Sequence, residues 1–301
     1  MHEIMQTAQG RSVTASKARE RLLELIPAVE RRLDLAGIST PVIEGGEGSP
    51  VVLLHGPGES LLKWLRVFPG LVGTHRVIAP DLPGHGASTV TGSLDAGRTL
   101  SWLGELIERA CPSPPALVGQ IVGGAIAARF AATRGDRLRA LILSDTLGLA
   151  PFQPAPEFGA ALMAHISRPD EATYDALWDR CACDLPRLRT DMGRSWDLLK
   201  TYALDRARAP GLGEAQHALM EAFGMRPVPG AELAAITVPT ALIWGRQDLA
   251  TPLAVAEAAA VRYGWALHVI DGAGDDPAME QPEAFVQVLG AALRRHVSPS
   301  R

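Results

Sequence analysis

The pattern of apolar and polar positions predicts a sheet that is buried on both faces. Val51-Val52-Leu53-Leu54 is a wholly apolar run, as is typical of a strand covered by helices on both sides. Similar short runs alternate with helix-like segments along most of the chain. The expected strands span residues 29–35, 41–44, 51–54, 76–80, 115–119, 138–144, 239–244 and 266–270. The expected helices span residues 60–70, 95–110, 121–133, 252–262 and 282–296. This alternation predicts an α/β fold with a mostly parallel, eight-stranded sheet.

One long segment interrupts the alternation. Residues 148–235 contain three or four helical patterns and no strand-like run, and they are too long for a loop. They predict an inserted helical lid above the carboxyl ends of the strands, where ligands bind in open α/β sheets. Residues 28–147 and 236–301 then form the core, and residues 1–27 form a helical extension. The apolar face of its helix, residues 15–26, consists of Ala18, Leu22, Leu25 and Ile26.

Composition and charge narrow the range of partners. Lys and Arg number 29 against 33 Asp and Glu, and a net charge of −4 argues against nucleic acid or an anionic membrane as the main partner. No run of about 18 apolar residues predicts a membrane span, and the N-terminus lacks a signal-peptide pattern. Three cysteines are an odd and sparse set, which favours reduced thiols and a cytoplasmic location. A largely apolar small molecule remains the expected partner, for a monomer or a homodimer.

Five short motifs carry a resemblance to the α/β-hydrolase fold superfamily. They are Leu54-His55-Gly56, Asp81-Leu82-Pro83-Gly84-His85-Gly86-Ala87-Ser88, Val118-Gly119-Gln120-Ile121-Val122-Gly123-Gly124, Trp244-Gly245-Arg246-Gln247-Asp248, and Gly272-Ala273-Gly274-Asp275-Asp276-Pro277. Their order and positions match that superfamily over roughly residues 38–296. The resemblance implies the fold of this superfamily, with a nucleophile on a sharp strand-to-helix turn.

The chain departs from the family pattern where catalysis would occur. Ile121 occupies the centre of the nucleophile turn, and Asp275 occupies the histidine position. Pro57 stands where the resemblance places the first oxyanion donor, and proline has no N–H group. Val122 could still supply the second donor. A Ser-His-Asp mechanism is therefore not expected.

Three aspartates are the candidate catalytic residues. The resemblance places Asp248 within hydrogen-bond reach of the histidine position, so that its carboxyl group would face that of Asp275. Two carboxyl groups in one site raise the pKa of one of them, and the pair could act as acid and base. Alternatively, Asp275 is too short to reach Asp248 and contacts water or Arg246. Asp145 follows the strand at 138–144, where the family sometimes carries its catalytic acid, and it could also be a relocated nucleophile.

Seven further residues are the candidate substrate contacts: His55, Pro57, Gln120, Ile121, Val122, Trp178 and His165. Gln120 could orient a carbonyl group or merely fill space. His55 is expected to be structural, with a lesser possibility that it acts as a base. Trp178 and His165 belong to the lid and either line the pocket or pack the lid. The spacing Cys181-x-Cys183 is not a zinc pattern, and no sequence motif implies a metal or a cofactor.

These observations favour a cofactor-free enzyme of secondary metabolism that uses acid–base catalysis. Lyase, isomerase, cyclase and epoxide-opening reactions all fit this chemistry. Two alternatives remain open at this point. One is a small-molecule-binding protein that has lost catalysis, and the other is a hydrolase with a relocated nucleophile.

Overall fold

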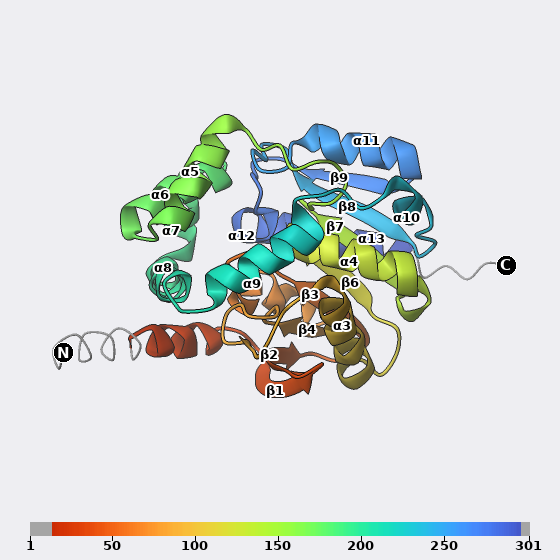
Figure 1. The fold of residues 1–301 in the computed structure, drawn as a ribbon, viewed down its shortest axis with the longest axis horizontal. Helices are drawn as coiled ribbons and strands as arrows, with labels where there is room; N and C mark the ends of the chain where they lie inside the picture. The colour runs from red at the N-terminus through yellow and green to blue at the C-terminus, as the bar shows by residue number, and fades with distance from the viewer. Residues whose placement is uncertain (1–13, 296–301) are drawn as a thin grey trace.

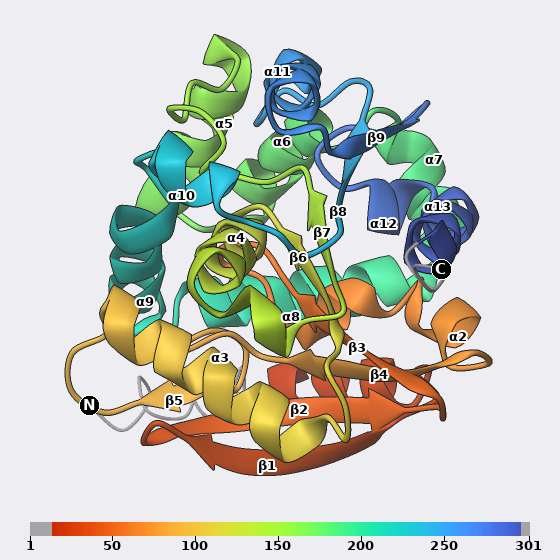
Figure 2. The same cartoon turned by 90° about the vertical axis from the view of Figure 1, so that its right-hand side faces the viewer.

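A central, strongly twisted sheet organises the part of the chain that the computed structural model describes, residues 14–295 (Figures 1 and 2). Its main path runs in the order β1-β2-β4-β3-β6-β7-β8-β9, and β5 pairs with β2 beside this path. The strands are β1 (Val29–Leu35), β2 (Ile38–Gly45), β3 (Ser49–Leu54), β4 (His75–Pro80), β5 (Thr89–Val90), β6 (Ala116–Gln120), β7 (Ala140–Ser144), β8 (Thr240–Gly245) and β9 (Ala266–Ile270). The eight predicted strands are all present, and β5 is an additional strand of two residues.

The sheet is parallel where helices connect its strands. The pairs from β4–β3 to β8–β9 are parallel, whereas β2 pairs antiparallel with β1, β4 and β5. Parallel neighbours need a crossover connection, and the chain supplies helices for it. Their carboxyl ends therefore meet at one edge of the sheet, where β3, β6, β7 and β8 end.

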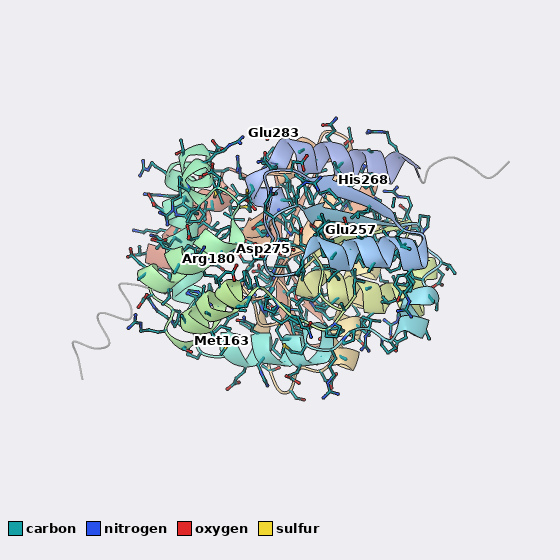
Figure 3. The ribbon with its side chains drawn as sticks, turned by 90° about the horizontal axis from the view of Figure 1, so that it is seen from above. Met163, Arg180, Glu257, His268, Asp275 and Glu283 are labelled. Atoms are coloured by element: carbon teal, nitrogen blue, oxygen red, sulfur yellow. The ribbon has the colours of Figure 1, made fainter. Side chains whose placement is uncertain are left out.

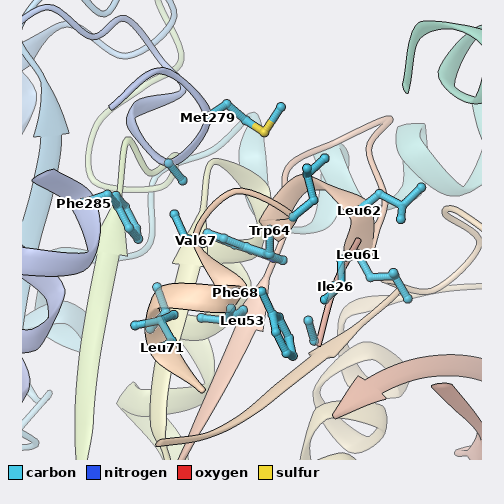
Figure 4. Packing of buried hydrophobic residues seen from close by; sticks show 14 of the residues in the cluster. Ile26, Leu53, Leu61, Leu62, Trp64, Val67, Phe68, Leu71, Met279 and Phe285 are labelled. Atoms are coloured by element: carbon cyan, nitrogen blue, oxygen red, sulfur yellow. The ribbon is translucent and has the colours of Figure 1, made fainter. Parts of the chain in front are cut away.

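Alternate residues of each strand enter two separate apolar layers. On β3, Leu53 packs with Trp64, Phe68 and Phe285 on one face (Figure 4). Its neighbour Leu54 belongs to the layer on the opposite face. This alternation follows from the two-residue period of a strand, and it explains why the buried strands are apolar throughout. The core helices and 3₁₀ turns are η1 (Leu61–Trp64), α2 (Phe68–Leu71), α3 (Ala96–Ala110), α4 (Val122–Arg134), η2 (Gly135–Arg137), α11 (Leu253–Tyr263), α12 (Pro277–Glu280) and α13 (Pro282–Arg295).

The segment between β7 and β8 is described throughout and contains helices but no strand. Its elements are α5 (Pro156–Ser167), α6 (Glu171–Cys181), α7 (Leu185–Met192), α8 (Arg194–Ala207), α9 (Leu212–Leu219), the π-helical turn η3 (Met220–Gly224) and α10 (Gly230–Ala234). Helices α5 to α8 lie to one side of the sheet in Figure 1, whereas α10 packs on α4. None of the helices described is both long enough and apolar enough to cross a bilayer.

Two local predictions were wrong. The helix expected at residues 60–70 is instead η1 followed by the short α2, since Pro69 and Gly70 do not favour a continuous helix. The N-terminal helix ends at residue 23, so Leu25 lies in a turn and is 53% exposed. Residues 1–13 of the predicted extension lie outside the described part of the chain.

Candidate functional site

The turn between β6 and α4 keeps the backbone of a nucleophile elbow without a nucleophile. Ile121 has φ 48° and ψ −113°, a conformation that is a steric outlier for a β-branched residue. Glycines make the turn possible, since a Cβ atom at Gly119 would lie 2.4 Å from the carbonyl oxygen of Gly123. Such strain persists only where the surrounding structure imposes it. The elbow therefore holds an apolar side chain where the family motif presents a reactive one.

A cavity of about 630 Å³ lies between this turn and helices α5, α6, α8 and α9. Its walls are mostly apolar, as is usual in small-molecule sites. Of the ten predicted site residues, five line it: Pro57, Ile121, His165, Trp178 and Asp275. The aromatic part of the wall is continued by Tyr174 and Tyr202, and Met163 and Ile166 of α5 form an exposed part of the lining. Figure 3 shows Met163 on α5 and Asp275 near the centre of the molecule.

His55 is held by backbone on both of its ring nitrogens. Nδ1 lies 2.8 Å from the carbonyl oxygen of Gly56, and Nε2 accepts from the N–H of Leu82 at 2.9 Å. This arrangement fixes the neutral tautomer with the proton on Nδ1. Burial and then the nearby His85 ring lower the pKa of His55. Its placement is structural, with no free nitrogen for a substrate or for base catalysis.

Gln120 and Val122 also lie behind the cavity wall. The Gln120 amide donates to the carbonyl oxygen of Asp275 at 2.8 Å, so it fixes the loop that carries this aspartate. Val122 is the first residue of α4 and is fully buried. The N–H groups of a first helical turn have no acceptor within their helix, so Val122 retains a potential donor.

One end of the cavity is polar, and sequence reasoning missed three of its residues. Glu59, Lys63 and Asp276 line it beside Asp275. Lys63 Nζ lies 2.6 Å from Asp276 Oδ2 and 3.3 Å from Glu59 Oε1. Burial alone would lower the pKa of Lys63, but Asp276 and Glu59 raise it above its usual value, so the ammonium group is charged. The four-residue spacing of Glu59 and Lys63 was a signal in the sequence for a local ion pair.

Asp275 is the most strongly perturbed carboxyl group of the cavity wall. Burial raises its pKa well above the usual aspartate range, and the charges of Asp248 and Asp276 raise it further. Lys63 acts in the opposite direction. Burial raises the pKa of the half-buried Cys181 thiol well above its usual value, and the nearby charge of Asp275 raises it further. Arg246 forms an ion pair with Asp271 rather than with Asp275.

Asp248 and Asp145 lie behind the wall rather than in it. Asp248 accepts from the backbone N–H groups of Ala250 and Thr251 and from the Thr251 hydroxyl, and burial raises its pKa to about 7. Asp145 accepts from Gly245 N–H at 2.8 Å and from the Ser144 hydroxyl at 2.7 Å. Burial and then Asp248 raise the pKa of Asp145 well above its usual value. Asp248 thus acts on both other aspartates electrostatically, and a shared proton between Asp248 and Asp275 stays a prediction.

Glu280 connects the Asp275 loop to the segment that follows α6. Its carboxylate accepts from Gly274 N–H at 2.7 Å and from Cys183 N–H at 2.6 Å. The N–H of Asp275 in turn donates to the carbonyl oxygen of Cys181 at 3.2 Å. The polar end of the cavity is therefore anchored to the end of α6. In the described residues, no cluster of three metal-ligating side chains has a geometry that could hold a metal ion.

The site predicts that serine-directed reagents will not label this protein. Ile121 cannot attack an ester, and Asp275, which the resemblance places at the position of the activating histidine, has no imidazole. Incubation with a fluorophosphonate probe and with short p-nitrophenyl esters should give neither adduct nor turnover above the buffer rate. A serine hydrolase assayed in parallel verifies the reagents. Stoichiometric labelling of any serine would show a relocated nucleophile.

Comparison with known proteins agrees with this architecture. Residues 51–288 match the alpha/beta hydrolase family. The chain is 29% identical over 279 residues to the 2-hydroxymuconate semialdehyde hydrolase of Pseudomonas sp. (strain CF600), covering 89% of this chain and 94% of the relative. It is 27% identical over 263 residues to the pimeloyl-[acyl-carrier protein] methyl ester esterase of Aeromonas hydrophila, covering 84% and 98%. A solved structure of a bacterial membrane phospholipase A superposes with a TM-score of 0.79 at 24% identity, over 98% of this chain and 97% of that one. The chain belongs to the alpha/beta hydrolase family.

Proposed function

We propose that this protein is a cofactor-free acid–base enzyme that acts on a mostly apolar small molecule. The observation that carries the proposal is the position of Asp275, a buried carboxyl group at the polar end of an otherwise apolar cavity. Burial and two acidic neighbours, Asp248 and Asp276, raise its pKa well above the usual aspartate range, which favours the protonated form of the group. A carboxyl group that is protonated at neutral pH is suited to act as a general acid.

Glu59 is the best placed partner base. Its side chain also lines the cavity, and it accepts from Lys63 and from the N–H of Gly56. Burial raises its pKa, while Lys63 counteracts this effect. A base is most effective when its pKa lies close to the working pH. In the proposed reaction, Asp275 gives its proton to a substrate oxygen and Glu59 takes a proton from a neighbouring atom, so no proton is gained or lost overall.

The names of related hydrolases do not fix the reaction of this chain. The relatives named above are a semialdehyde hydrolase and a methyl ester esterase. With Ile121 at the elbow, covalent catalysis by that residue is not available. Lyase, isomerase, cyclase and epoxide-opening reactions need only the acid and the base. A cytoplasmic role in secondary metabolism is part of the same proposal.

The protonation of Asp275 can be measured without knowing the substrate. Infrared difference spectroscopy between the wild type and Asp275→Asn should show a protonated carboxyl band that persists at about pH 7 and is absent from the variant. The exposed Asp179→Asn variant is the control and should leave this band unchanged. Incubation with a library of apolar ketones, enones and epoxides, followed by mass spectrometry, should then identify compounds that the wild type converts.

For such a compound, Asp275→Asn should lower kcat by about 10²–10⁴-fold, as is typical for loss of a general acid, while binding persists. An ionised Asp275 at neutral pH would contradict the proposed acid. Tight binding of library compounds with no conversion of any of them would favour the binding-protein alternative.

A further inference from the structure

This chain has fewer of the backbone N–H groups that normally donate to a substrate oxygen in this fold. Pro57 has no N–H group, and the N–H of Gly56 already donates to Glu59 Oε2 at 2.8 Å. Of the expected positions, only Val122 at the start of α4 keeps a potential donor. A substrate oxygen at the polar end of the cavity therefore needs donors from side chains.

Lys63 has the geometry of such a donor. It lies on η1, it is 4% exposed, and it lines the cavity. An ammonium group has three N–H donors, and in the described part of the chain Lys63 has two carboxylate acceptors, Asp276 and Glu59. One donor remains for a ligand. Because the two carboxylates hold the Nζ atom in place, the Lys63 side chain loses little conformational entropy when this donor binds a ligand.

The charges at this end of the cavity favour a neutral oxygen over an ion. Glu59, Asp275 and Asp276 line it together with Lys63, and Cys181 adds a thiol. Asp248 and Glu280 lie behind them, so an anionic ligand would meet an excess of acidic groups. Glu59 and Asp276 are already paired with Lys63, and Asp275 is protonated in the proposed function, so a cationic ligand would find no unpaired carboxylate in this part of the wall. A carbonyl oxygen carries no charge and accepts two hydrogen bonds through its two lone pairs.

We propose that Lys63 and protonated Asp275 donate to the same carbonyl oxygen, and that the substrate is a largely apolar carbonyl compound. The two side chains thereby replace the missing oxyanion donors. This inference rests on the proposed function and adds to it a substrate class and a further catalytic residue. As the Asp275 proton passes to the carbonyl oxygen, Glu59 removes a proton from the adjacent carbon. The C–H electrons form the new C=C bond of a neutral enol, and nothing is oxidised or reduced.

A matched pair of probes tests the donors directly. Acetophenone and ethylbenzene have similar shapes, but only acetophenone has a carbonyl oxygen. The wild type should bind acetophenone more tightly than ethylbenzene, and the isotope-labelled carbonyl stretch of bound acetophenone should shift to lower frequency than in an apolar solvent. Lys63→Met should weaken acetophenone binding by about 10–100-fold, the usual range for a hydrogen bond to a charged group, and should reverse part of the frequency shift. Ethylbenzene binding should be unchanged.

Two further variants keep the test decisive. Lys63→Met leaves Asp276 and Glu59 without their shared cation, and the double variant Lys63→Met/Asp276→Asn removes the nearer of these two uncompensated charges. It should show the same loss of acetophenone binding. Arg206 is a second cation of the cavity wall, bonded to Gly86 and Asp205, and Arg206→Gln should leave the carbonyl stretch unchanged.

The outcomes separate this inference from the proposed function. If wild type shows no preference for acetophenone, or if Arg206→Gln rather than Lys63→Met reverses the shift, Lys63 is not the donor. The proposed acid still stands in that case, provided that the infrared band of protonated Asp275 is present. If this band is absent, the proposed function fails before the Lys63 test is applied.

Discussion

At about pH 8, Asp145→Asn should be more stable to unfolding than the wild type, although it removes an ionisable group from the sheet edge. Asp145 is fully buried, and burial together with Asp248 raises its pKa well above the usual value of 3.8. As the pH rises above about 4, the unfolded chain loses this proton while the folded chain keeps it, so folding becomes less favourable. Each pH unit between about 4 and the folded-state pKa lowers the free energy of unfolding by about 1.4 kcal/mol. An asparagine does not ionise, so the variant does not lose this stability.

The substitution also suits the local structure. An asparagine can still accept from Gly245 N–H and can donate to the Ser144 hydroxyl, so both hydrogen bonds of Asp145 have a replacement. The residue has φ 45°, a region in which asparagine is common. Denaturant unfolding at several pH values measures the effect. The advantage of the variant should shrink toward about pH 4, leaving only the part that does not depend on pH.

The exposed Asp34→Asn variant on β1 serves as the control and should show no such pH-dependent gain. A constant difference between Asp145→Asn and wild type over the whole pH range would mean that the carboxyl group of Asp145 has the same pKa in the folded and the unfolded chain. A destabilisation that grows as the pH rises above about 4 would mean that the charge of Asp145 supports the fold.

Much of the core could be predicted because its signals are local. Three local signals indicate positions in a parallel sheet. They are the wholly apolar strands, the small residues around Gly119 and Gly123, and the aspartates that follow β7 and β8. Strand β9 spans residues 266–270, as expected from its sequence. The N-terminal prediction for Leu25 was wrong because the helical period gave no sign of where the helix ends.

The polar end of the cavity could not be predicted to the same degree, because it depends on contacts between distant segments. Asp275 was identified from its place in a motif. Its environment comes from Lys63 on η1, from Cys181 at the end of α6 and from Glu280 on α12. No spacing rule links Lys63 to Asp276 across the sequence, although their charged atoms are 2.6 Å apart. The hydrogen bonds that Asp248 accepts from the N–H groups of Ala250 and Thr251 are local in the sequence. They were not predicted, because Asp248 was expected to contact Asp275 instead.

The expected correspondence of positions 121, 248 and 275 with a catalytic triad can be tested by introducing a serine and a histidine. Ile121→Ser alone should leave p-nitrophenyl ester hydrolysis at the background rate, because the new serine has no imidazole to take its proton. Ile121→Ser/Asp275→His supplies this base, and Asp248 already acts electrostatically on position 275. The elbow has the positive φ that family members use to expose the nucleophile, and residues 121 and 275 both line the cavity.

The double variant should exceed Ile121→Ser by about 10–100-fold in ester hydrolysis, a feeble activity for a serine triad. General-base catalysis alone can contribute more, but the absent donor at Pro57 costs a substantial share of the rate. Adding Asp248→Asn to the double variant should return the activity toward background, because the new histidine would lose the carboxylate that orients it. Equal activity of the single and double variants would show that position 275 does not correspond to the family histidine. An inactive double variant that is folded, with the histidine titrating normally, would show instead that the side chains at 121 and 275 do not meet.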